Sequence, residues 1–319
     1  GLDFPDMFGA SAPQTNNARM RNRGWELSLN WRGKIGNDIN YSVGGSLSDA
    51  TAEVTEYANP TGTNPAGNWY VGRKVGEIWG YRAEGIIQTQ AEADEYNKYD
   101  LSYLSGKAWE PGDVKYVDLN GDKAINRGKN TLEDMGDMTI IGNTTPRYQY
   151  TFNGSISWKD LSLSMMFQGV GKRDWDPGTA PYFWGSGAYA QVTVFNEHMD
   201  YWREDNPNAY YPKPYIHSAG GVTPFRNKIM QTSDRYLQSG AYCRLKNITL
   251  SYNLPSSWTQ RVGLQKVQVF FSGENLLTFT SLKGMFDPEA IFTGNSYTSE
   301  GGKNYPMNKV VSFGLVVNL

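Results

Sequence analysis

Apolar and polar residues alternate along the stretch from Pro146 to Gly171. In its first half the apolar side chains share one parity: Tyr148, Tyr150, Phe152, Ile156 and Trp158. Small or polar side chains hold the other parity: Gln149, Thr151, Asn153, Ser155 and Ser157. Consecutive side chains of a strand point to opposite faces, so the pattern predicts a strand with one apolar and one polar face.

The alternation returns after Lys159-Asp160, which we interpret as a two-residue turn. On the return strand Leu161, Leu163, Met165 and Phe167 alternate with Ser162, Ser164 and Gln168. Each strand has about the length that a tilted strand needs to cross a bilayer, roughly 9–11 residues. Two environments produce such a hairpin. In a soluble sandwich the apolar face is the core, whereas in an outer-membrane barrel it meets lipid and the polar face lines a wet lumen. The hairpin alone favours the soluble interpretation, because soluble sheets are common.

Similar alternation predicts seven strands, at residues 24–32, 38–52, 146–158, 161–171, 241–253, 266–277 and 307–319. The connections between them are alternately short and long, and the long ones cover residues 53–145, 172–240 and 278–306. In an antiparallel meander every second connection lies at the same end, so all long loops gather at one end of the sheet. Bacterial outer-membrane barrels have this asymmetry, with short periplasmic turns and long extracellular loops. The loop order therefore favours an all-β, transmembrane antiparallel β-barrel.

Seven strands do not close such a barrel, because bacterial single-chain barrels have even strand numbers. An open sheet would also leave two unpaired edges in lipid, where backbone groups have no water to bind. We therefore expect the chain to form the last seven strands of a larger barrel.

The composition agrees with this interpretation and excludes several functions. Charged residues make up 19% of the chain, below the quarter that is usual in soluble domains, and aromatic residues make up 14%. The net charge of -2 gives no basic footprint for nucleic acid. Cys243 is the one cysteine, and His198 and His217 are the two histidines, so a zinc site or a histidine-based triad is poorly supplied.

Two carboxylate pairs, Glu133/Asp134 and Asp287/Glu289, have the residue types of a glycosidase dyad. Charged loops produce such pairs constantly, and we expect no enzyme. No run of about 20 apolar residues is present, so no transmembrane helix is expected.

Several segments together resemble a known family, in the order in which that family has them. They are residues 24–31, 75–81, 111–122, 141–148, 167–171, 244–252, 273–277 and 305–314. Among them are Gly-Trp-Glu-Leu-Ser-Leu-Asn-Trp at the start and Gly-Glu-Asn-Leu-Leu near the end. The chain resembles the C-terminal barrel portion of the SusC-like TonB-dependent transporters (the RagA/SusC family) of Bacteroidetes outer membranes.

The resemblance implies a 22-stranded barrel with a plugged lumen. The family's plug domain is N-terminal and has no counterpart in this chain. The implied partners are the remaining N-terminal barrel and plug, a SusD-like surface lipoprotein, TonB and outer-membrane lipid. The implied function is import of glycans, or of peptides in some members. The loops would be extracellular and the C-terminus would lie on the periplasmic side. A passive porin and a secreted all-β glycan-binding or adhesion module remain as alternatives, and a soluble module would need no detergent.

The sharpest local motif is Asp118-Leu-Asn-Gly-Asp122. With Asn126 it places side-chain oxygens at alternate positions around a glycine turn, as calcium loops do; Asp134 or Asp137 would add a late carboxylate. The motif departs from the EF-hand pattern, because Gly121 precedes Asp122 and no glutamate stands at the twelfth position. A structural Ca²⁺ ion is one interpretation of this loop, and a surface loop rich in Asx turns is the other. We expect no organic cofactor.

The second long loop is rich in aromatic residues that are candidates for contact with substrate or lipoprotein: Tyr182, Phe183, Trp184, Tyr189, Trp202, Tyr210 and Tyr211. The alternative is that a long ordered loop needs a small core of its own. A second set lies on polar strand faces and is expected to face the lumen: Glu26, Asn30, Asn153, Gln168 and Glu274.

Overall fold

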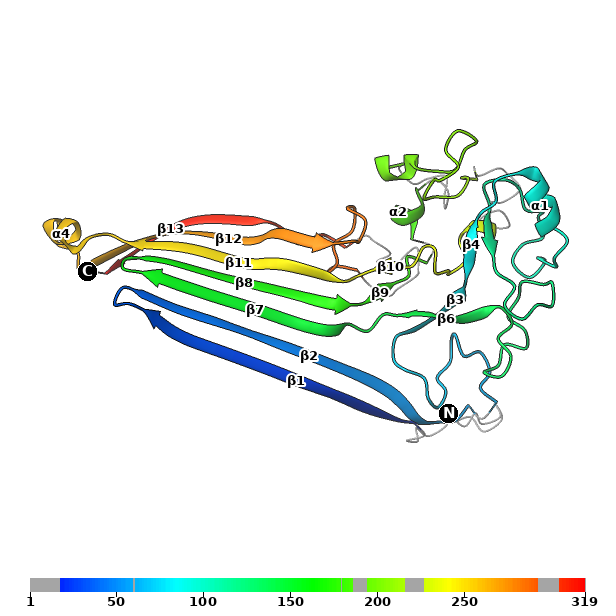
Figure 1. Cartoon of the computed structure of the whole chain (residues 1–319), viewed down its shortest axis with the longest axis horizontal. Helices are drawn as coiled ribbons and strands as arrows, with labels where there is room; N and C mark the ends of the chain where they lie inside the picture. The colour runs from blue at the N-terminus through cyan, green and yellow to red at the C-terminus, as the bar shows by residue number, and fades with distance from the viewer. Residues whose placement is uncertain are drawn as a thin grey trace, which may run out of the picture. The chain divides into compact units, whose positions relative to one another are not determined.

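The computed structural model in Figure 1 describes residues 18–59, 61–178, 180–185, 194–215, 227–291 and 304–318. The chain divides into two units, which are described separately. The first, called the sheet unit, comprises residues 24–50, 145–177 and 238–319. The second, called the loop unit, comprises residues 1–23, 51–144 and 178–237.

A seven-stranded sheet dominates the sheet unit (Figure 1). Its strands are β1 (Ala18–Ile35), β2 (Ile39–Tyr57), β7 (Arg147–Trp158), β8 (Leu161–Lys172), β11 (Tyr242–Asn253), β12 (Lys266–Thr280) and β13 (Val310–Asn318). They lie side by side in chain order, and the pairs from β2–β7 to β12–β13 are antiparallel. The sheet is therefore the predicted meander. Within the described residues neither β1 nor β13 has a second neighbour, so both outer edges are open.

Most strand ends lie close to the predicted positions, but β1 begins at Ala18 and β2 ends at Tyr57, several residues beyond the predicted ends. The alternation predicted a strand only from Gly24, whereas Ala18–Arg23 already belong to β1. In this part of the hairpin charged side chains pair across the strands, with Arg19 at 3.0 Å from Glu56 and Arg21 at 3.5 Å from Glu53. No apolar row marks the strand there, so the alternation that we used ends before the strand does.

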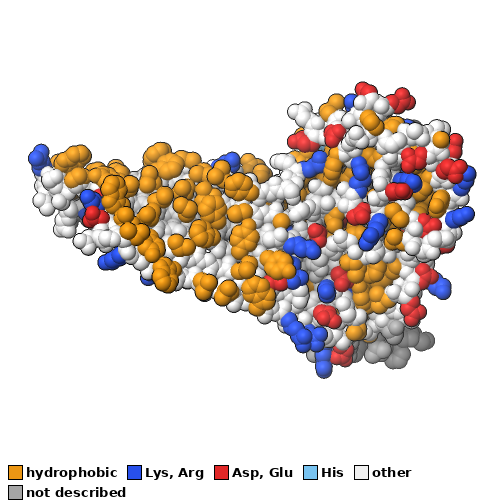
Figure 2. All heavy atoms as spheres, in the orientation of Figure 1, with side chains coloured by type: hydrophobic (Ala, Val, Ile, Leu, Met, Phe, Trp, Pro, Cys, Tyr) orange, Lys and Arg blue, Asp and Glu red, His pale blue; other side chains and the backbone are white. Residues whose placement is uncertain are grey.

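Cross-strand register makes each face of the sheet continuous. Ile156 of β7 lies opposite Tyr41 of β2 and Leu163 of β8, so the apolar rows of neighbouring strands coincide. Figure 2 shows hydrophobic side chains gathered over one face of the sheet. Many remain open to solvent, with Trp31 68% exposed and Phe313 81% exposed. A soluble sandwich would bury such a face, and an exposed apolar area of this extent indicates contact with another apolar phase.

The opposite face carries a row of hydroxyl groups at one level of six strands. In register these residues are Ser42, Ser155, Ser164, Thr249, Ser272 and Ser312. The Oγ atoms of Ser42 and Ser155 are 2.8 Å apart. Hydroxyl pairs of this kind stabilise a sheet and suit a wet, uncharged surface.

Short connections join alternate strand pairs. Residues 36–38 connect β1 to β2, and Lys159-Asp160 connects β7 to β8, with Gly36 and Lys159 in the left-handed region (φ 61° and 52°) that tight turns require. Residues 254–265 connect β11 to β12 and contain α4 (Ser256–Thr259) and η4 (Gln260–Val262). Since consecutive strands are antiparallel, these connections share one end of the sheet, and the long connections leave from the other.

The loop unit is built from segments of the first two long connections. It contains β3 (Glu77–Tyr81) paired with β6 (Met138–Asn143), and β4 (Ala83–Ile86) paired with β5 (Val114–Tyr116). Its helices include α1 (Gln90–Tyr96), α2 (Pro181–Trp184) and η3 (Asn196–Met199). Helix α1 begins after Thr89, whose hydroxyl accepts the backbone N–H of Glu92. In the described ranges no helix is long and apolar enough to span a membrane.

A buried ion pair joins the two connections inside the loop unit. Lys228 Nζ lies 2.7 Å from Asp113 Oδ2, and both side chains are fully buried. The Tyr215 hydroxyl donates to Asp113 Oδ1 at 2.5 Å, and Lys228 also donates to the carbonyl of Ala108. Burial raises the pKa of the Asp113 carboxyl above its ordinary value even though a cation lies beside it. The two long connections therefore form one packed body.

Candidate functional site

The polar face of the sheet carries the residues predicted to face a lumen. Asn30 and Asn153 converge over Gly44, where an added Cβ would lie 2.2 Å from Asn30 Oδ1 and 3.1 Å from Asn153 Nδ2. Gln168 lies opposite Thr151 and Arg244, and Glu274 lies opposite Asn247 and Val310. Glu26 shares the parity of Asn30 on β1 and is exposed. All five thus belong to one face, and their contact with a lumen stays a prediction.

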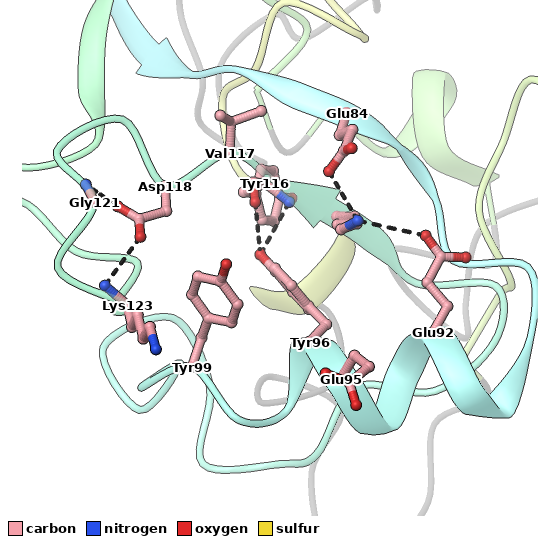
Figure 3. A pocket seen from close by; sticks show the side chains of 11 residues that line it. Glu84, Glu92, Glu95, Tyr96, Tyr99, Tyr116, Val117, Asp118, Gly121 and Lys123 are labelled. Carbon is pink, nitrogen blue, oxygen red and sulfur yellow. Dashed lines mark hydrogen bonds and ion pairs between the residues drawn. The ribbon is translucent and has the colours of Figure 1, made fainter.

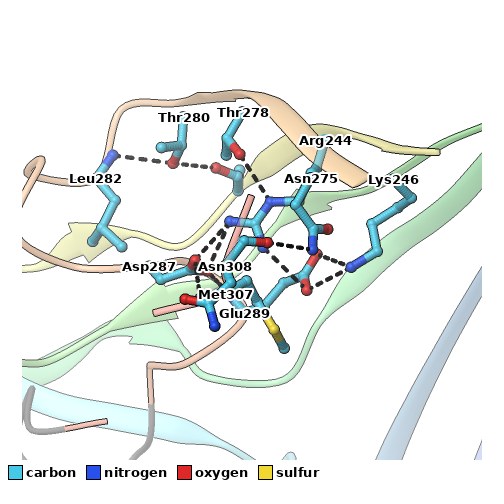
Figure 4. Close-up of polar contacts among 11 residues, drawn as sticks. Arg244, Lys246, Asn275, Thr278, Thr280, Leu282, Asp287, Glu289, Met307 and Asn308 are labelled. Atoms are coloured by element: carbon cyan, nitrogen blue, oxygen red, sulfur yellow. Dashed lines mark hydrogen bonds and ion pairs between the residues drawn. The ribbon is translucent and has the colours of Figure 1, made fainter. Parts of the chain in front are cut away.

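A cluster of charged side chains binds the third long connection to this polar face (Figure 4). Arg244 of β11 is 3% exposed, and its Nη2 donates to both carboxylate oxygens of Asp287 at 2.8 Å. Its Nη1 lies 3.2 Å from Glu289 Oε2, and its Nε donates to Thr278 Oγ1 at 2.8 Å. Lys246 Nζ donates to Glu289 at 3.0 Å. The carboxylate pair Asp287/Glu289 therefore has cationic partners on β11 and anchors the third long connection to the sheet.

Apolar contacts fix the same segment. Phe286 packs edge-on against Trp175 of β9 (Asp174–Trp175) with ring centroids 4.9 Å apart, and β9 pairs with β10 (Gln238–Ser239). Leu282 and Ile291 are also buried. Segment 282–291 is therefore held to the sheet unit by both charge pairing and packing.

The pKa of Asp287 predicts how this anchor responds to acid. Burial alone would raise the pKa, but the Glu289 amide, the Arg244 guanidinium and the Met307 amide outweigh it and hold the pKa below its ordinary value of 3.8. A carboxyl with a lowered pKa stabilises the fold above its unfolded pKa and loses this effect as pH falls through the folded pKa. We expect the protection of amides in residues 282–291 against hydrogen exchange, relative to the intrinsic rate at each pH, to fall below about pH 3.8. Asp287→Asn should exchange fast at neutral pH already, and a wild-type segment that stays protected at pH 2 would contradict the assignment.

The aromatic candidates of the second long connection mostly form a core in the loop unit. Phe183 is 0% exposed and packs against Trp184, Tyr211 and Tyr236 at centroid distances of 5.0, 5.6 and 6.3 Å. Trp184 and Tyr211 are buried as well. For Phe183, Trp184 and Tyr211 the interpretation as contact residues was therefore wrong, because buried rings are not available to a ligand, and the alternative of a small loop core holds.

The remaining members of this set differ in exposure. Trp202 is buried, and its Nε1 donates to Gln88 Oε1 at 2.9 Å, so it too is a core residue and not a contact residue. Tyr210 is half-buried, and Tyr182 is 37% exposed. Tyr189 lies outside the described residues. Contact with substrate or lipoprotein stays a prediction for Tyr182 and Tyr210.

Two adjacent substitutions separate these roles. We expect Phe183→Ala to destabilise the loop unit by about 3–5 kcal/mol, because a large side chain leaves a cavity in a packed core. Tyr182→Ala, at an exposed neighbour, should change stability by less than about 0.5 kcal/mol. Limited proteolysis of the loops measures both. Equal protease resistance of Phe183→Ala and wild type would contradict the core assignment.

In this structure the candidate calcium ligands accept hydrogen bonds from backbone N–H groups of the same loop. Asp118 accepts the N–H groups of Gly121 and Lys123 at 2.7 and 2.9 Å. Asp137, which is 0% exposed, accepts the N–H groups of Leu119 and Asn126 at 2.7 and 2.8 Å. The Asp118 bonds are local, as the alternative interpretation expects, whereas Asp137 joins backbone groups that lie 18 and 11 residues away.

The other candidate ligands are also engaged within the loop. Asn120 donates to Asp122, Asn126 accepts from Gly128, and Asp134 accepts from Gly136. In the part of the chain that the structure describes, no three acidic, histidine or cysteine side chains form a group that could hold a metal. The candidate side chains are thus engaged with the loop itself in this arrangement, and a cation would have to displace some of these hydrogen bonds. One feature of the EF-hand is nevertheless present: Lys123, the sixth residue counted from Asp118, has φ 62° where that motif places glycine.

Calcium binding stays a prediction with a direct test. If the loop binds calcium, about 1 mM Ca²⁺, a concentration typical for extracellular modules, should raise the Tm of the intact protein relative to EDTA. Asp118→Asn should abolish this increase. Identical melting curves of the wild type in calcium and in EDTA would reject the hypothesis.

A hollow of about 610 Å³ lies beside this loop in the loop unit (Figure 3). Three of its charged groups pair with one another, since Lys115 Nζ lies 2.8 Å from Glu84 and 3.6 Å from Glu92. The hydrogen bond with Glu84 raises the pKa of Lys115. Tyr96 donates to the carbonyl of Tyr116 and accepts its N–H, both at 3.0 Å. The hollow is thus a polar depression whose ion pairs stabilise the fold.

Two charged groups were not recognised from the sequence as parts of clusters. Arg244 lies 43 residues from Asp287, and Lys228 lies 115 residues from Asp113. For Arg244 the available signal was two cations, Arg244 and Lys246, in a strand with no acidic residue, which indicates an anionic partner without identifying it.

The sequence was compared with family models and with curated proteins to find which proteins it is similar to. No family model matches the chain. Among curated proteins, it is 28% identical to TonB-dependent receptor P3 of Formosa agariphila over 92% of this chain, and 25% identical to TonB-dependent receptor P26 of the same organism over 99%. The resemblance to SusC-like TonB-dependent receptors is confirmed. The matches cover 27% and 31% of these receptors, so the chain spans about three-tenths of their length.

Solved structures support the same fold for this chain. The RagAB peptide transporter matches 99% of the chain with a TM-score of 0.64 at 23% identity, and the chain covers 31% of that protein. The RagAB peptide importer in its open-open state matches 100% of the chain with a TM-score of 0.65 at 21% identity, and the chain again covers 31%. At this identity the likeness concerns the fold. The seven strands thus correspond to part of a larger barrel, and the named relatives are receptors and transporters.

Proposed function

We propose that this chain forms part of the wall of an outer-membrane, TonB-dependent importer that takes up glycans or peptides. The observation that carries the proposal is the two-faced sheet. One face is apolar and exposed from Trp31 to Phe313, whereas the other carries hydroxyl and amide side chains. Such a sheet separates lipid from water when its open edges are closed by further strands.

The proposal includes the parts that the chain does not contain. Further strands would complete the barrel, a plug would fill its lumen, and TonB would supply the energy through the plug. The loop unit would lie on the extracellular side, since the long connections leave from one end of the sheet. The C-terminal end of β13 lies at the opposite end, with the short turns, and would be periplasmic.

A SusD-like lipoprotein is the proposed partner of the extracellular side. Supporting this, the two long connections form a packed body with a buried core and a buried ion pair, which gives a partner a fixed surface. The structurally similar RagAB is a peptide transporter. We propose that this chain itself catalyses no reaction, because the carboxylates of Asp287 and Glu289 form ion pairs with Arg244 and Lys246.

The experiment is isolation of the intact protein from native outer membranes in mild detergent, followed by identification of its companions. We expect a large complex that contains the plug and remaining barrel together with a surface lipoprotein. A pore that conducts ions without TonB would favour the porin. A 35.8 kDa monomer that stays soluble without detergent or companions would defeat the importer and favour a secreted binding module.

A further inference from the structure

A hollow of about 480 Å³ lies on the polar face of the sheet unit, beside the turn that joins β1 to β2. The side chains that matter for its chemistry are Arg32, Lys34, Asn40, Ser42, Ser155 and Ser157. They come from three neighbouring strands, β1, β2 and β7. Two cations thus stand beside a surface of neutral hydrogen-bonding groups.

The two cations have no anion of their own in the described ranges. No ion pair of Arg32 or Lys34 is found there, and both side chains are exposed. Asp38, the acidic residue of the same turn, lies 3.9 Å from Lys159 instead. The neutral groups bind each other: Ser42 and Ser155 share a hydrogen bond of 2.8 Å, and Ser157 donates to the carbonyl of Asn40 at 3.5 Å. The hollow therefore carries two uncompensated positive charges.

The position of these charges excludes lipid as the natural occupant. Trp31 belongs to the apolar row of β1, and Arg32 and Lys34 have the opposite parity. They share the face of Ser42 and Ser155, which lies away from the apolar side chains. An anion reaching them must therefore come from the polar side of the sheet.

We propose that this hollow binds an acidic segment of polypeptide, with one carboxylate on Arg32 and a second on Lys34. Arginine presents a planar fork that fits a carboxylate with two parallel hydrogen bonds, and lysine binds as a point charge. The serine hydroxyls and the Asn40 amide both donate and accept, as contact with a polypeptide backbone requires. The inference rests on the proposed function, because the plugged lumen of a transporter brings polypeptide to this face.

Carbodiimide coupling tests this inference in the intact transporter within outer membranes. The reagent activates a carboxylate, a nearby lysine amine attacks it, and an amide forms while the reagent leaves as a urea. We expect mass spectrometry to find Lys34 joined to an aspartate or glutamate of a segment outside the seven-stranded sheet. Lys34→Gln should remove this product, and Arg32→Lys should add a second product with the same segment. Coupling of Lys159 to Asp38 serves as the internal control, because the two already lie 3.9 Å apart.

Two outcomes overturn the inference. The first is coupling of Lys159 to Asp38 while Lys34 forms no product or couples only to Asp38. The second is a phosphate-bearing lipid that native mass spectrometry finds on the wild type and not on the double variant Arg32→Gln/Lys34→Gln. Membrane residence and the lipoprotein companion are measured on the same preparations. If both are present without a Lys34 product, the inference fails and the proposed function stands. A Lys34 product in a protein that is not in the membrane would support the acidic segment and contradict the proposed function.

Discussion

Phe152→Arg should prevent stable insertion of the protein into the outer membrane. Phe152 lies in the middle of β7 on the apolar face, is 43% exposed, and has Phe167 beside it at a centroid distance of 6.4 Å. An arginine on the lipid side of a barrel costs about 2–4 kcal/mol at the bilayer midplane. We expect loss of heat-modifiable, folded barrel in outer-membrane preparations and accumulation of degraded protein.

The next residue supplies the matched control. Asn153 is on the polar face, and Asn153→Arg should leave the amount of folded barrel close to wild type, because water on that face solvates the charge. Phe152→Leu controls for the loss of the ring and should also insert. If Asn153→Arg were the more harmful of the two arginine variants, the assignment of the faces would be inverted.

Arg244→Met should release the third long connection from the wall. The substitution leaves the nearly buried carboxylate of Asp287 without its guanidinium partner and leaves Glu289 with Lys246 as its remaining cation. Removing one partner of a buried charge cluster costs about 3–5 kcal/mol, because the remaining charges stay desolvated. We expect rapid cleavage within residues 282–291 by added protease, with the strands themselves still protected.

A compensated variant distinguishes the lost pairing from general damage. Arg244→Met combined with Asp287→Asn removes the carboxylate that loses its partner, while Glu289 keeps its ion pair with Lys246, and should restore part of the protease resistance. Lys246→Met should have a smaller effect than Arg244→Met, because Glu289 then still has Arg244 as a cationic partner. Equal cleavage of the single and compensated variants would show that shape and not charge holds the segment.

The strands and their faces could be predicted because their pattern is local. A period of two fixes which side chains share a face, and the pairs Tyr41–Ile156 and Ser42–Ser155 follow from it. Phe270 breaks the pattern in the sequence, and the structure gives the reason: it lies opposite Gly314, where an added Cβ would come within 2.3 Å of its ring. An aromatic side chain on the polar face thus covers a glycine of the neighbouring strand.

The charged cluster could not be predicted, because its geometry depends on a bulge. By parity alone Arg244 would share the apolar face of Ile248. The register shifts between Leu245 and Asn247, however, and places Arg244 on the polar face opposite Gln168. Its partners come from a distant loop, and no local pattern specifies where a loop returns. The aromatic loop core is similar: Phe183 and Tyr236 meet through chain closure and have no common period.

Lipid accessibility of two adjacent residues tests most directly whether the sheet divides lipid from an aqueous lumen. Spin labels are placed on cysteines that replace Ile156 or Ser155 in the reconstituted transporter, with Cys243 changed to serine. We predict that the label at residue 156 collides with membrane-dissolved oxygen and is shielded from a water-soluble nickel reagent, while the label at residue 155 does the opposite. Equal access of the nickel reagent to both labels would contradict a sheet with one lipid-facing and one water-facing side.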